Sequence, residues 1–192
     1  MKQQIILIGL PKSGTSSFQF LFEQMKLKSY HWEYQREKIG TIMNRNKQQK
    51  KPLLSGIDNW DCITQMDVCL SNNENFWPQV TDLEQLYEEN PNCVFILNKR
   101  NPEKMLQSWK KWGNLDQRMY NFNPELVRPK NDEGLLLFFR NHFNTVETFF
   151  QSKPTSKFLS FDIEHDNLQK LREYIHIDET IITFPHQNKN VK

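Results

Sequence analysis

"IILIGLPKSGTSSF", residues 5–18, is the stretch that decides the fold of this chain. It begins with the continuous apolar run Ile5–Ile8, which is typical of a short strand buried on both faces of a parallel sheet. Gly9 ends the run, and a turn rich in hydroxyl residues leads into residues 16–27, where apolar side chains recur at helical spacing. We therefore expect a strand, a turn and a helix.

The turn has the glycine spacing of a phosphate-binding loop but places its lysine differently. In a GxxxxGK[ST] loop, backbone amides hold phosphates and the lysine follows the second glycine. Here Gly9 and Gly14 have that spacing, yet Thr15 follows Gly14 and the lysine is Lys12, at the apex. Amides at a helix start favour anions, and the hydroxyl residues up to Ser17 add donors. We expect Lys12 to face the group attached to a bound phosphate, where it would stabilise the charge on a leaving group.

The remaining sequence alternates short apolar runs with helical patterns, which favours an α/β fold with a central parallel β-sheet flanked by helices in three layers. Further strands are expected over residues 60–66, 93–97 and 157–161. Further helices are expected over residues 82–89, 102–112, 133–151 and 168–175. The polar, basic residues 35–51 are interpreted as an exposed helix that frays into a loop, and residues 113–129 as an irregular loop. We expect one domain, residues 1–192.

Composition narrows the class of protein. The chain has 192 residues and a net charge of +2, which is too balanced for a general nucleic-acid binder. Its three cysteines, Cys62, Cys69 and Cys93, form no disulfide framework or CxxC metal site and predict buried thiols in a reducing compartment. We see neither a signal peptide nor a membrane helix, so we expect a soluble, cytoplasmic protein.

The segment "GLPKSGTSSFQFLFE", residues 9–23, resembles the 5′-phosphosulfate loop of the sulfotransferases that use 3′-phosphoadenosine 5′-phosphosulfate (PAPS). The pattern of that loop is PKSGT or PRTGT. In the family the loop binds the 5′-phosphate, and its lysine or arginine helps the sulfuryl group to leave. The resemblance implies that role for Lys12 and implies a P-loop sulfotransferase fold. The donor-binding residues that it implies in the loop are Pro11, Lys12, Ser13, Gly14, Thr15, Ser16 and Ser17.

A second motif of the family is a strand that ends in arginine, followed by a helix with a serine eight residues later. "CVFILNKRNPEKMLQSWKKW", residues 93–112, supplies Arg100 and Ser108 at these positions. The resemblance implies that they hold the 3′-phosphate, and an arginine fork with a hydroxyl suits a dianion. "FPHQN", residues 184–188, also resembles a tail segment of the short, soluble branch of this family. The glycine- and lysine-rich C-terminal loop of other cytosolic members is missing, which leaves open how the adenine and 3′-phosphate are covered.

A nucleotide kinase or NTPase is the first alternative. "NKRN" is similar to the guanine-reading NKxD motif of GTPases, but Asn101 stands in place of its aspartate. An NTPase would also need a magnesium-binding aspartate after a buried strand, and here cationic residues follow instead. We therefore expect no metal. A non-catalytic protein of the same fold that binds PAPS or its product, 3′,5′-adenosine diphosphate (PAP), is the second alternative.

Sulfuryl transfer to a hydroxyl or amine benefits from a general base. In the family this base is a histidine or glutamate near the sulfuryl group. Residues just after the first helix offer His31 and Glu33, which we rank together, and Asp67 ranks third. His142 lies in an aromatic helix and is interpreted as a packed histidine. Four tryptophans are interpreted as core residues: Trp60, Trp77, Trp109 and Trp112.

The sequence thus predicts a PAPS-dependent sulfotransferase that moves a sulfuryl group to a hydroxyl or amine by metal-free, in-line transfer. The acceptor, whether a small molecule, a glycan or a peptide, is not specified by any motif. The basic residues 45–51 and the 113–131 segment are candidates for shaping its pocket. We expect no nucleic-acid or membrane partner, and the oligomeric state stays open.

Overall fold

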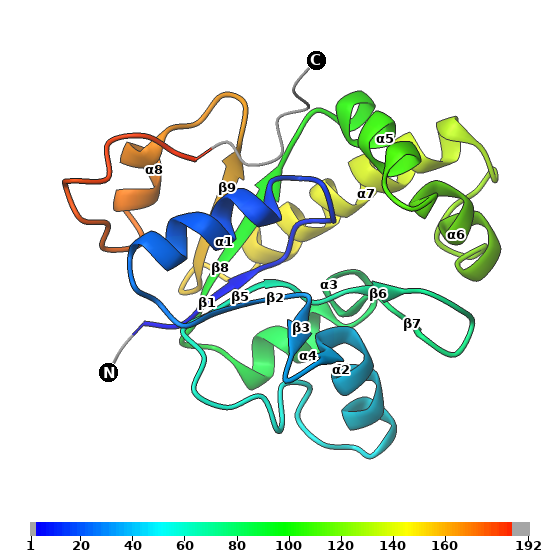
Figure 1. The fold of residues 1–192 in the computed structure, drawn as a ribbon, viewed down its shortest axis with the longest axis horizontal. Helices are drawn as coiled ribbons and strands as arrows, with labels where there is room; N and C mark the ends of the chain where they lie inside the picture. The colour runs from blue at the N-terminus through cyan, green and yellow to red at the C-terminus, as the bar shows by residue number, and fades with distance from the viewer. Residues whose placement is uncertain (1–2, 186–192) are drawn as a thin grey trace.

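A parallel sheet of five strands, in the order β2-β5-β1-β8-β9, forms the centre of the computed structural model, which describes residues 3–185 (Figure 1). Its strands are β1 (Ile5–Leu7), β2 (Ser29–His31), β5 (Cys62–Gln65), β8 (Val94–Lys99) and β9 (Lys157–Asp162). Two antiparallel pairs lie outside it: β3 (Glu33–Tyr34) with β4 (Glu37–Lys38), and β6 (Val68–Cys69) with β7 (Asn75–Phe76). The helices are α1 (Thr15–Gln24), α2 (Ile39–Gln48), α3 (Pro78–Thr81), α4 (Leu83–Glu89), α5 (Pro102–Lys111), α6 (Leu115–Phe122), α7 (Asp132–Gln151) and α8 (Leu168–Arg172).

Strand β1 lies in the middle of the sheet and pairs in parallel with β5 on one side and with β8 on the other. The chain therefore reverses its direction of progress across the sheet at β1, which makes the carboxyl end of β1 a topological switch point. Ligands of open α/β sheets bind at such points. The loop that joins β1 to α1 begins at this end of the sheet, and α5 follows β8 at the same end (Figure 1).

The two faces of the sheet are covered by separate cores. Successive strand residues point to opposite faces, so Ile6 packs into a core with residues of α2, α4, α5 and α7. Ile5 and Leu7 pack into the other core, with residues of α1 and α8. Helices on both faces of a parallel sheet give three layers, and the expected α/β class is confirmed.

Most expected elements are present with shifted ends, and two segments differ from expectation. The 113–129 segment is not irregular throughout, because α6 buries Leu115, Met119 and Tyr120 on one side while polar residues cover the other. The 35–51 segment is not an exposed helix, since it begins with the end of the β3–β4 hairpin and α2 then buries an apolar face. Edge strand β2 was not expected, because its three residues show no apolar run.

Three further expectations concern the cysteines, the membrane and the tail. Cys62, Cys69 and Cys93 are buried and form no disulfide within residues 3–185, as predicted. Among the helices of residues 3–185, none has the length and apolar character needed to cross a bilayer. Of the "FPHQN" segment, Phe184 is buried and its ring lies 4.9 Å from that of Phe18, whereas residues 186–188 fall outside the described part of the chain.

Candidate active site

The loop between β1 and α1 has the conformation of an anion cradle. Lys12 and Gly14 adopt left-handed backbone angles, with φ of 68° and 94°. Gly14 caps α1, and a Cβ there would lie 2.8 Å from a methyl group of Ile163, so glycine is required on both counts. Lys12 pays about 1–2 kcal/mol for its conformation, which persists because the surroundings hold it.

Four successive carbonyl groups of the loop, those of residues 10–13, accept hydrogen bonds from side chains. The Ser13 hydroxyl donates to the first at 2.5 Å. Trp109 Nε1, Arg100 Nη1 and Asn98 Nδ2 then donate to the carbonyls of residues 11, 12 and 13, at 2.8, 3.2 and 3.2 Å. These donors come from the end of β8 and from α5, so these two elements fix the direction of the loop's peptide groups.

Because the loop's carbonyl groups are held in this way, N–H groups of the loop and of the helix start are available to donate to a ligand. The backbone N–H groups of Lys12, Gly14, Thr15 and Ser16 donate to no other residue within 3–185. Consecutive unpaired amides at a helix N-terminus, together with the helix dipole, form a site for a phosphate group. The half-buried Ser16 hydroxyl has no partner in the described chain either, and so it remains a donor for the same anion.

Asn98 is the central brace of the loop, and sequence reasoning did not assign it this role. It is fully buried, accepts from Gly9 N–H at 3.0 Å and donates to Ser13 Oγ at 2.7 Å. The signal in the sequence that could have shown this role is a polar residue at the end of an otherwise apolar buried strand.

His142 is a packed histidine, as the sequence predicted. Its Nε2 donates to the Ile8 carbonyl at 2.8 Å, and burial lowers its pKa to about 4.

Two cations meet beside the loop. The Lys12 ammonium lies 5.1 Å from the ring centre of Trp112, and burial together with the charge of Arg100 lowers the pKa of Lys12. Arg100 Nε is buried without a hydrogen-bond partner among the described residues, and lies 3.9 Å from a carboxylate oxygen of Glu164. A positive pair of this kind is relieved by an anion. Ser108 lies half-buried on α5, and its hydroxyl has no partner within residues 3–185.

Of the three candidate bases, His31 has the most suitable hydrogen bonding. Its Nδ1 lies 3.0 Å from Thr64 Oγ1, and that hydroxyl has Gln19 Oε1 and the Tyr30 carbonyl as acceptors at 2.9 and 3.2 Å. In the tautomer in which the hydroxyl hydrogen serves one of these acceptors, His31 Nδ1 is the donor to Thr64. The Nε2 lone pair is left available. Burial, with a smaller contribution from the charge of Lys12, lowers the pKa of His31 to about 4.

The other two candidates are placed differently. Glu33 is exposed and forms an ion pair with Lys38 at 2.9 Å, on the β3–β4 hairpin. Asp67 is buried and accepts from Gln79 at 3.2 Å and Gln65 at 3.4 Å, and burial raises its pKa to about 7. Gln65 in turn accepts from the Thr15 hydroxyl at 3.2 Å, so Asp67 is joined to the loop through one amide.

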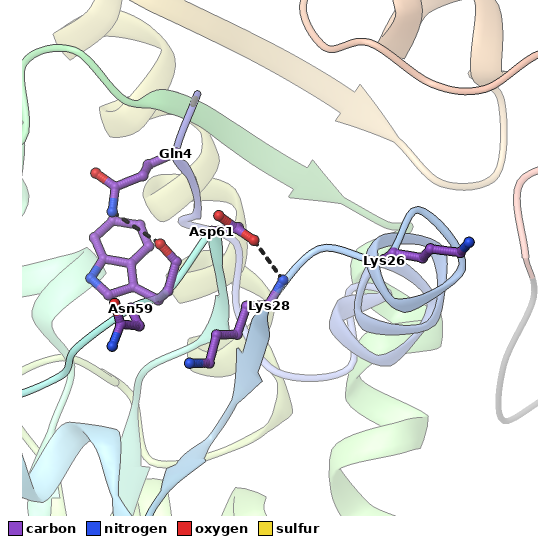
Figure 2. Close-up of a pocket in the computed structure, with 6 residues that line it drawn as sticks. Gln4, Lys26, Lys28, Asn59 and Asp61 are labelled. Carbon is purple, nitrogen blue, oxygen red and sulfur yellow. Dashed lines mark hydrogen bonds between the residues drawn. The ribbon is translucent and has the colours of Figure 1, made fainter. Parts of the chain in front are cut away.

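A surface hollow at the other end of the sheet is separate from this site. Gln4, Lys28 and Asp61 line it, and each precedes the start of a parallel strand, whereas the loop follows a strand end (Figure 2). Two of the side chains that line it are hydrogen-bonded to the backbone. Gln4 donates to the Trp60 carbonyl at 3.0 Å, and Asp61 accepts from Lys28 N–H at 2.7 Å. Within residues 3–185 no three His, Cys, Asp or Glu residues cluster so as to hold a metal ion.

Comparison with known proteins identifies the family. The sulfotransferase domain family matches residues 4–117, which is more than half of the chain and contains the loop, Arg100 and Ser108. The chain belongs to the sulfotransferase domain family. Among solved structures, shikimate kinase from Bacteroides thetaiotaomicron is similar in fold, with a TM-score of 0.52 at 10% identity over 90% of this chain and 94% of that one. A search of curated proteins gives no significant match.

Membership in this family confirms the resemblance drawn from the loop and supports sulfotransfer as the general activity. The likeness to a kinase concerns the fold alone, because at 10% identity the shared arrangement of strands and helices says nothing of substrate. The family match specifies neither the sulfuryl donor nor the residues that carry the chemistry.

Proposed function

We propose that this sulfotransferase takes its sulfuryl group from PAPS and transfers it to a hydroxyl or amine by in-line displacement without a metal. The observation that carries the proposal is the loop whose carbonyls are all tied back, so that four amides face an incoming anion. These amides and the Ser16 hydroxyl would hold the 5′-phosphate. Ser13, whose hydroxyl is used inside the loop, would contribute through the loop's shape.

Lys12 and Arg100 divide the work on the donor. Lys12 projects from the loop apex toward Trp112, so its ammonium would neutralise charge on the oxygen that bridges phosphorus and sulfur. Arg100, whose buried Nε has no hydrogen-bond partner among the described residues, and Ser108 two turns into α5 would hold the 3′-phosphate. Glu164 is the carboxylate that Arg100 would exchange for the phosphate.

His31 is proposed as the base. As the acceptor oxygen or nitrogen bonds to sulfur, its proton would pass to His31 Nε2, and the bridging S–O bond would break to release PAP. A neutral imidazole with a lone pair is suited to this step, whereas the ion-paired Glu33 and the buried Asp67 are not. The anionic donor would raise the low pKa of His31 toward the working pH.

The donor assignment is tested by thermal unfolding with PAP, 5′-AMP or magnesium-ATP. PAP at a hundred times its dissociation constant stabilises by about 2.7 kcal/mol, which is several degrees for this chain length. Arg100→Ala should lose the PAP shift, while Arg45→Ala, which removes an exposed arginine ion-paired to Glu37, should keep it. Stabilisation by magnesium-ATP alone would support the kinase alternative and overturn the proposal.

The base assignment is tested by acceptor-dependent release of PAP at saturating PAPS. His31→Gln should keep the PAP-induced thermal shift and lower the turnover about 10²–10⁴-fold, the usual contribution of a general base. Glu33→Gln is the matched control and should stay within about threefold of wild type. A large loss in Glu33→Gln with none in His31→Gln would reverse the assignment, and PAP binding without turnover on any acceptor would favour the non-catalytic alternative.

The setting of the reaction is also proposed. Three buried cysteines that form no disulfide within residues 3–185 fit a reducing compartment, so we place the enzyme in the cytoplasm; we also take residues 1–192 as a single catalytic domain. Donor, acceptor and enzyme would then meet without nucleic-acid or membrane partners.

A further inference from the structure

Two tryptophans form a partly exposed pair next to the Lys12 ammonium. Trp32 lies between β2 and β3, and Trp112 ends α5; their ring centres are 6.4 Å apart at an interplanar angle of 65°. Both are half-buried, and Trp112 differs in this from the core residue that the sequence predicted. Because Lys12 lies 5.1 Å from the Trp112 ring centre, the pair adjoins the point at which the sulfuryl group would be transferred.

Trp32 is held in place by its backbone. Its φ of 63° lies in the left-handed region, which a bulky side chain rarely adopts. The strain is supported on both sides, since Trp32 N–H donates to the Gln65 carbonyl and its carbonyl accepts from Ile39, each at 2.9 Å. Outliers of this kind concentrate at binding sites, where surrounding structure fixes them. The ring is therefore presented at the carboxyl end of β5 by a fixed support.

Cations surround the tryptophan pair. Lys38 Nζ lies 3.8 Å from the Trp32 ring centre, and the Arg118 guanidinium carbon lies 5.9 Å from that of Trp112. Arg118 donates from Nη1 to a backbone carbonyl at 2.6 Å, but its buried Nε has no partner in the described chain. Within residues 3–185, neither Lys12 nor Arg118 forms an ion pair. Burial raises the pKa of Asp67 and the charge of Arg118 opposes that rise, while the Asp67 carboxylate accepts hydrogen bonds from Gln79 and Gln65.

We propose that the acceptor is a hydroxylated ring compound that carries its own negative charge. Its ring would pack on the Trp32–Trp112 pair, its hydroxyl would face Lys12 and His31, and its anionic group would bind Arg118. Aromatic rings and the apolar face of a sugar both pack on indole, and an arginine that forms no ion pair within the described chain favours a carboxylate or sulfate. This inference rests on the proposed function, because it uses the Lys12 end of the site as the point of transfer.

The test is calorimetric binding of paired probes to the PAP-loaded protein. One pair is 4-hydroxyphenylacetate with 4-methylphenol, and the other is glucuronate with glucose. The charged member of at least one pair should bind about tenfold tighter than its neutral partner, and the pair that responds distinguishes an aryl from a sugar acceptor. Equal binding within both pairs, or no binding of any probe, would overturn the acceptor class.

Variants assign the charge preference to Arg118. Arg118→Gln should reduce the preference to within about threefold, Arg118→Lys should keep part of it, and Lys153→Gln should leave it unchanged, since Lys153 lies beyond the end of α7 near the start of β9. Should Arg118→Gln fail to fold, Trp112→Leu should weaken both members of the responding pair about equally. An unaltered preference in Arg118→Gln, or unaltered binding in Trp112→Leu, would refute the subsite. Failure of PAP itself to bind would instead refute the proposed function.

Discussion

Replacing Asn98 with alanine should damage stability and donor binding together, because this side chain holds the phosphate loop to the sheet. Asn98 accepts from Gly9 N–H at 3.0 Å and donates to the Ser13 carbonyl and hydroxyl at 3.2 and 2.7 Å. All three residues are buried, so water cannot readily replace the lost partners.

The size of the effect follows from these bonds. Three hydrogen bonds at about 1 kcal/mol each, with buried groups left unpaired, give about 3–5 kcal/mol of lost stability. For a chain of this length that corresponds to a fall in melting temperature of roughly 6–20 °C. Donor affinity should also fall about tenfold or more, because a freed loop must be ordered again when the phosphate binds.

The assay is urea unfolding combined with calorimetric titration of PAP, and Asn46→Ala is the matched control. Asn46 is also buried and makes two hydrogen bonds, to the carbonyls of Leu53 and Ser55 at 2.9 and 2.8 Å, but it lies in α2. Its replacement should cost about 2 kcal/mol of stability and leave PAP affinity unchanged. Equal PAP affinities in the Asn98→Ala and wild-type proteins would refute the idea that the brace prepares the loop for its anion.

Three further substitutions have defined outcomes. Gly9→Ala should prevent folding, measured by soluble yield and circular dichroism, because a Cβ there would overlap the carbonyl oxygen and side chain of Asn98. Trp109→Phe should lower stability by about 1–2 kcal/mol in urea and weaken PAP binding, because Pro11 loses its donor. Asp67→Asn should remove a pH dependence of the free energy of unfolding. The pKa of Asp67 in the folded protein, about 7, exceeds the ordinary 3.8. The stability that protonated Asp67 contributes is therefore full below pH 3.8 and is lost as the pH rises through 7. Urea unfolding at pH 5 and pH 8 should show that the stability of the variant relative to wild type is higher at pH 8 than at pH 5.

Controls for these substitutions come from the same residue types elsewhere. Gly56→Ala should be tolerated at a cost of about 1 kcal/mol, since no atom lies within 4 Å of its Cβ although φ is 82°. Trp77→Phe removes an indole donor to Asn75 instead of one to the loop, so it should leave PAP affinity unchanged. Parallel pH profiles for wild type and Asp67→Asn would contradict the raised pKa, and equal PAP affinities in the Trp109→Phe and wild-type proteins would contradict its role as a brace.

The central part of the fold could be predicted from sequence because its signals are local. Residues 5–18 contain a buried strand, the loop and a helix start in unbroken order, and the β8–α5 segment repeats the pattern with the N-cap Asn101, whose side chain accepts from Lys104 N–H at 3.0 Å. Edge strand β2 and helix α6 were missed for the opposite reason. Within residues 3–185, β2 pairs with β5 and with no second strand, so its residues need not be apolar. Helix α6 is short and flanked by turn-forming residues.

The candidate site likewise contains residues that local sequence signals indicate and residues that they do not. Lys12, Arg100 and Ser108 could be named as candidates because a motif marks each position, and their roles stay predictions. Trp32 and Arg118 carry no motif, and they approach Trp112 only through the tertiary fold. Of the three candidate bases, His31 and Glu33 follow the first helix and Asp67 follows β5, and their hydrogen-bond and ion-pair partners are what distinguish them. The neutral His31 with a free lone pair, the ion-paired Glu33 and the buried Asp67 could not be distinguished by residue type.

The position of Lys12 at the loop apex and the direction of the loop's peptide groups have a joint consequence for where charge is stabilised. With the lysine after the second glycine, the helix start would supply both cation and amides to the same phosphate. Here the helix start supplies amides and the Ser16 hydroxyl but no cation, and the Thr15 hydroxyl donates to the side-chain amide oxygen of Gln65, a neutral group, at 3.2 Å. The cation at the apex instead lies 5.1 Å from the ring centre of Trp112, a ring that Arg118 also approaches. In the proposed function, charge stabilisation would thereby act on the bond beyond the held phosphate, as transfer of a group off a phosphate requires.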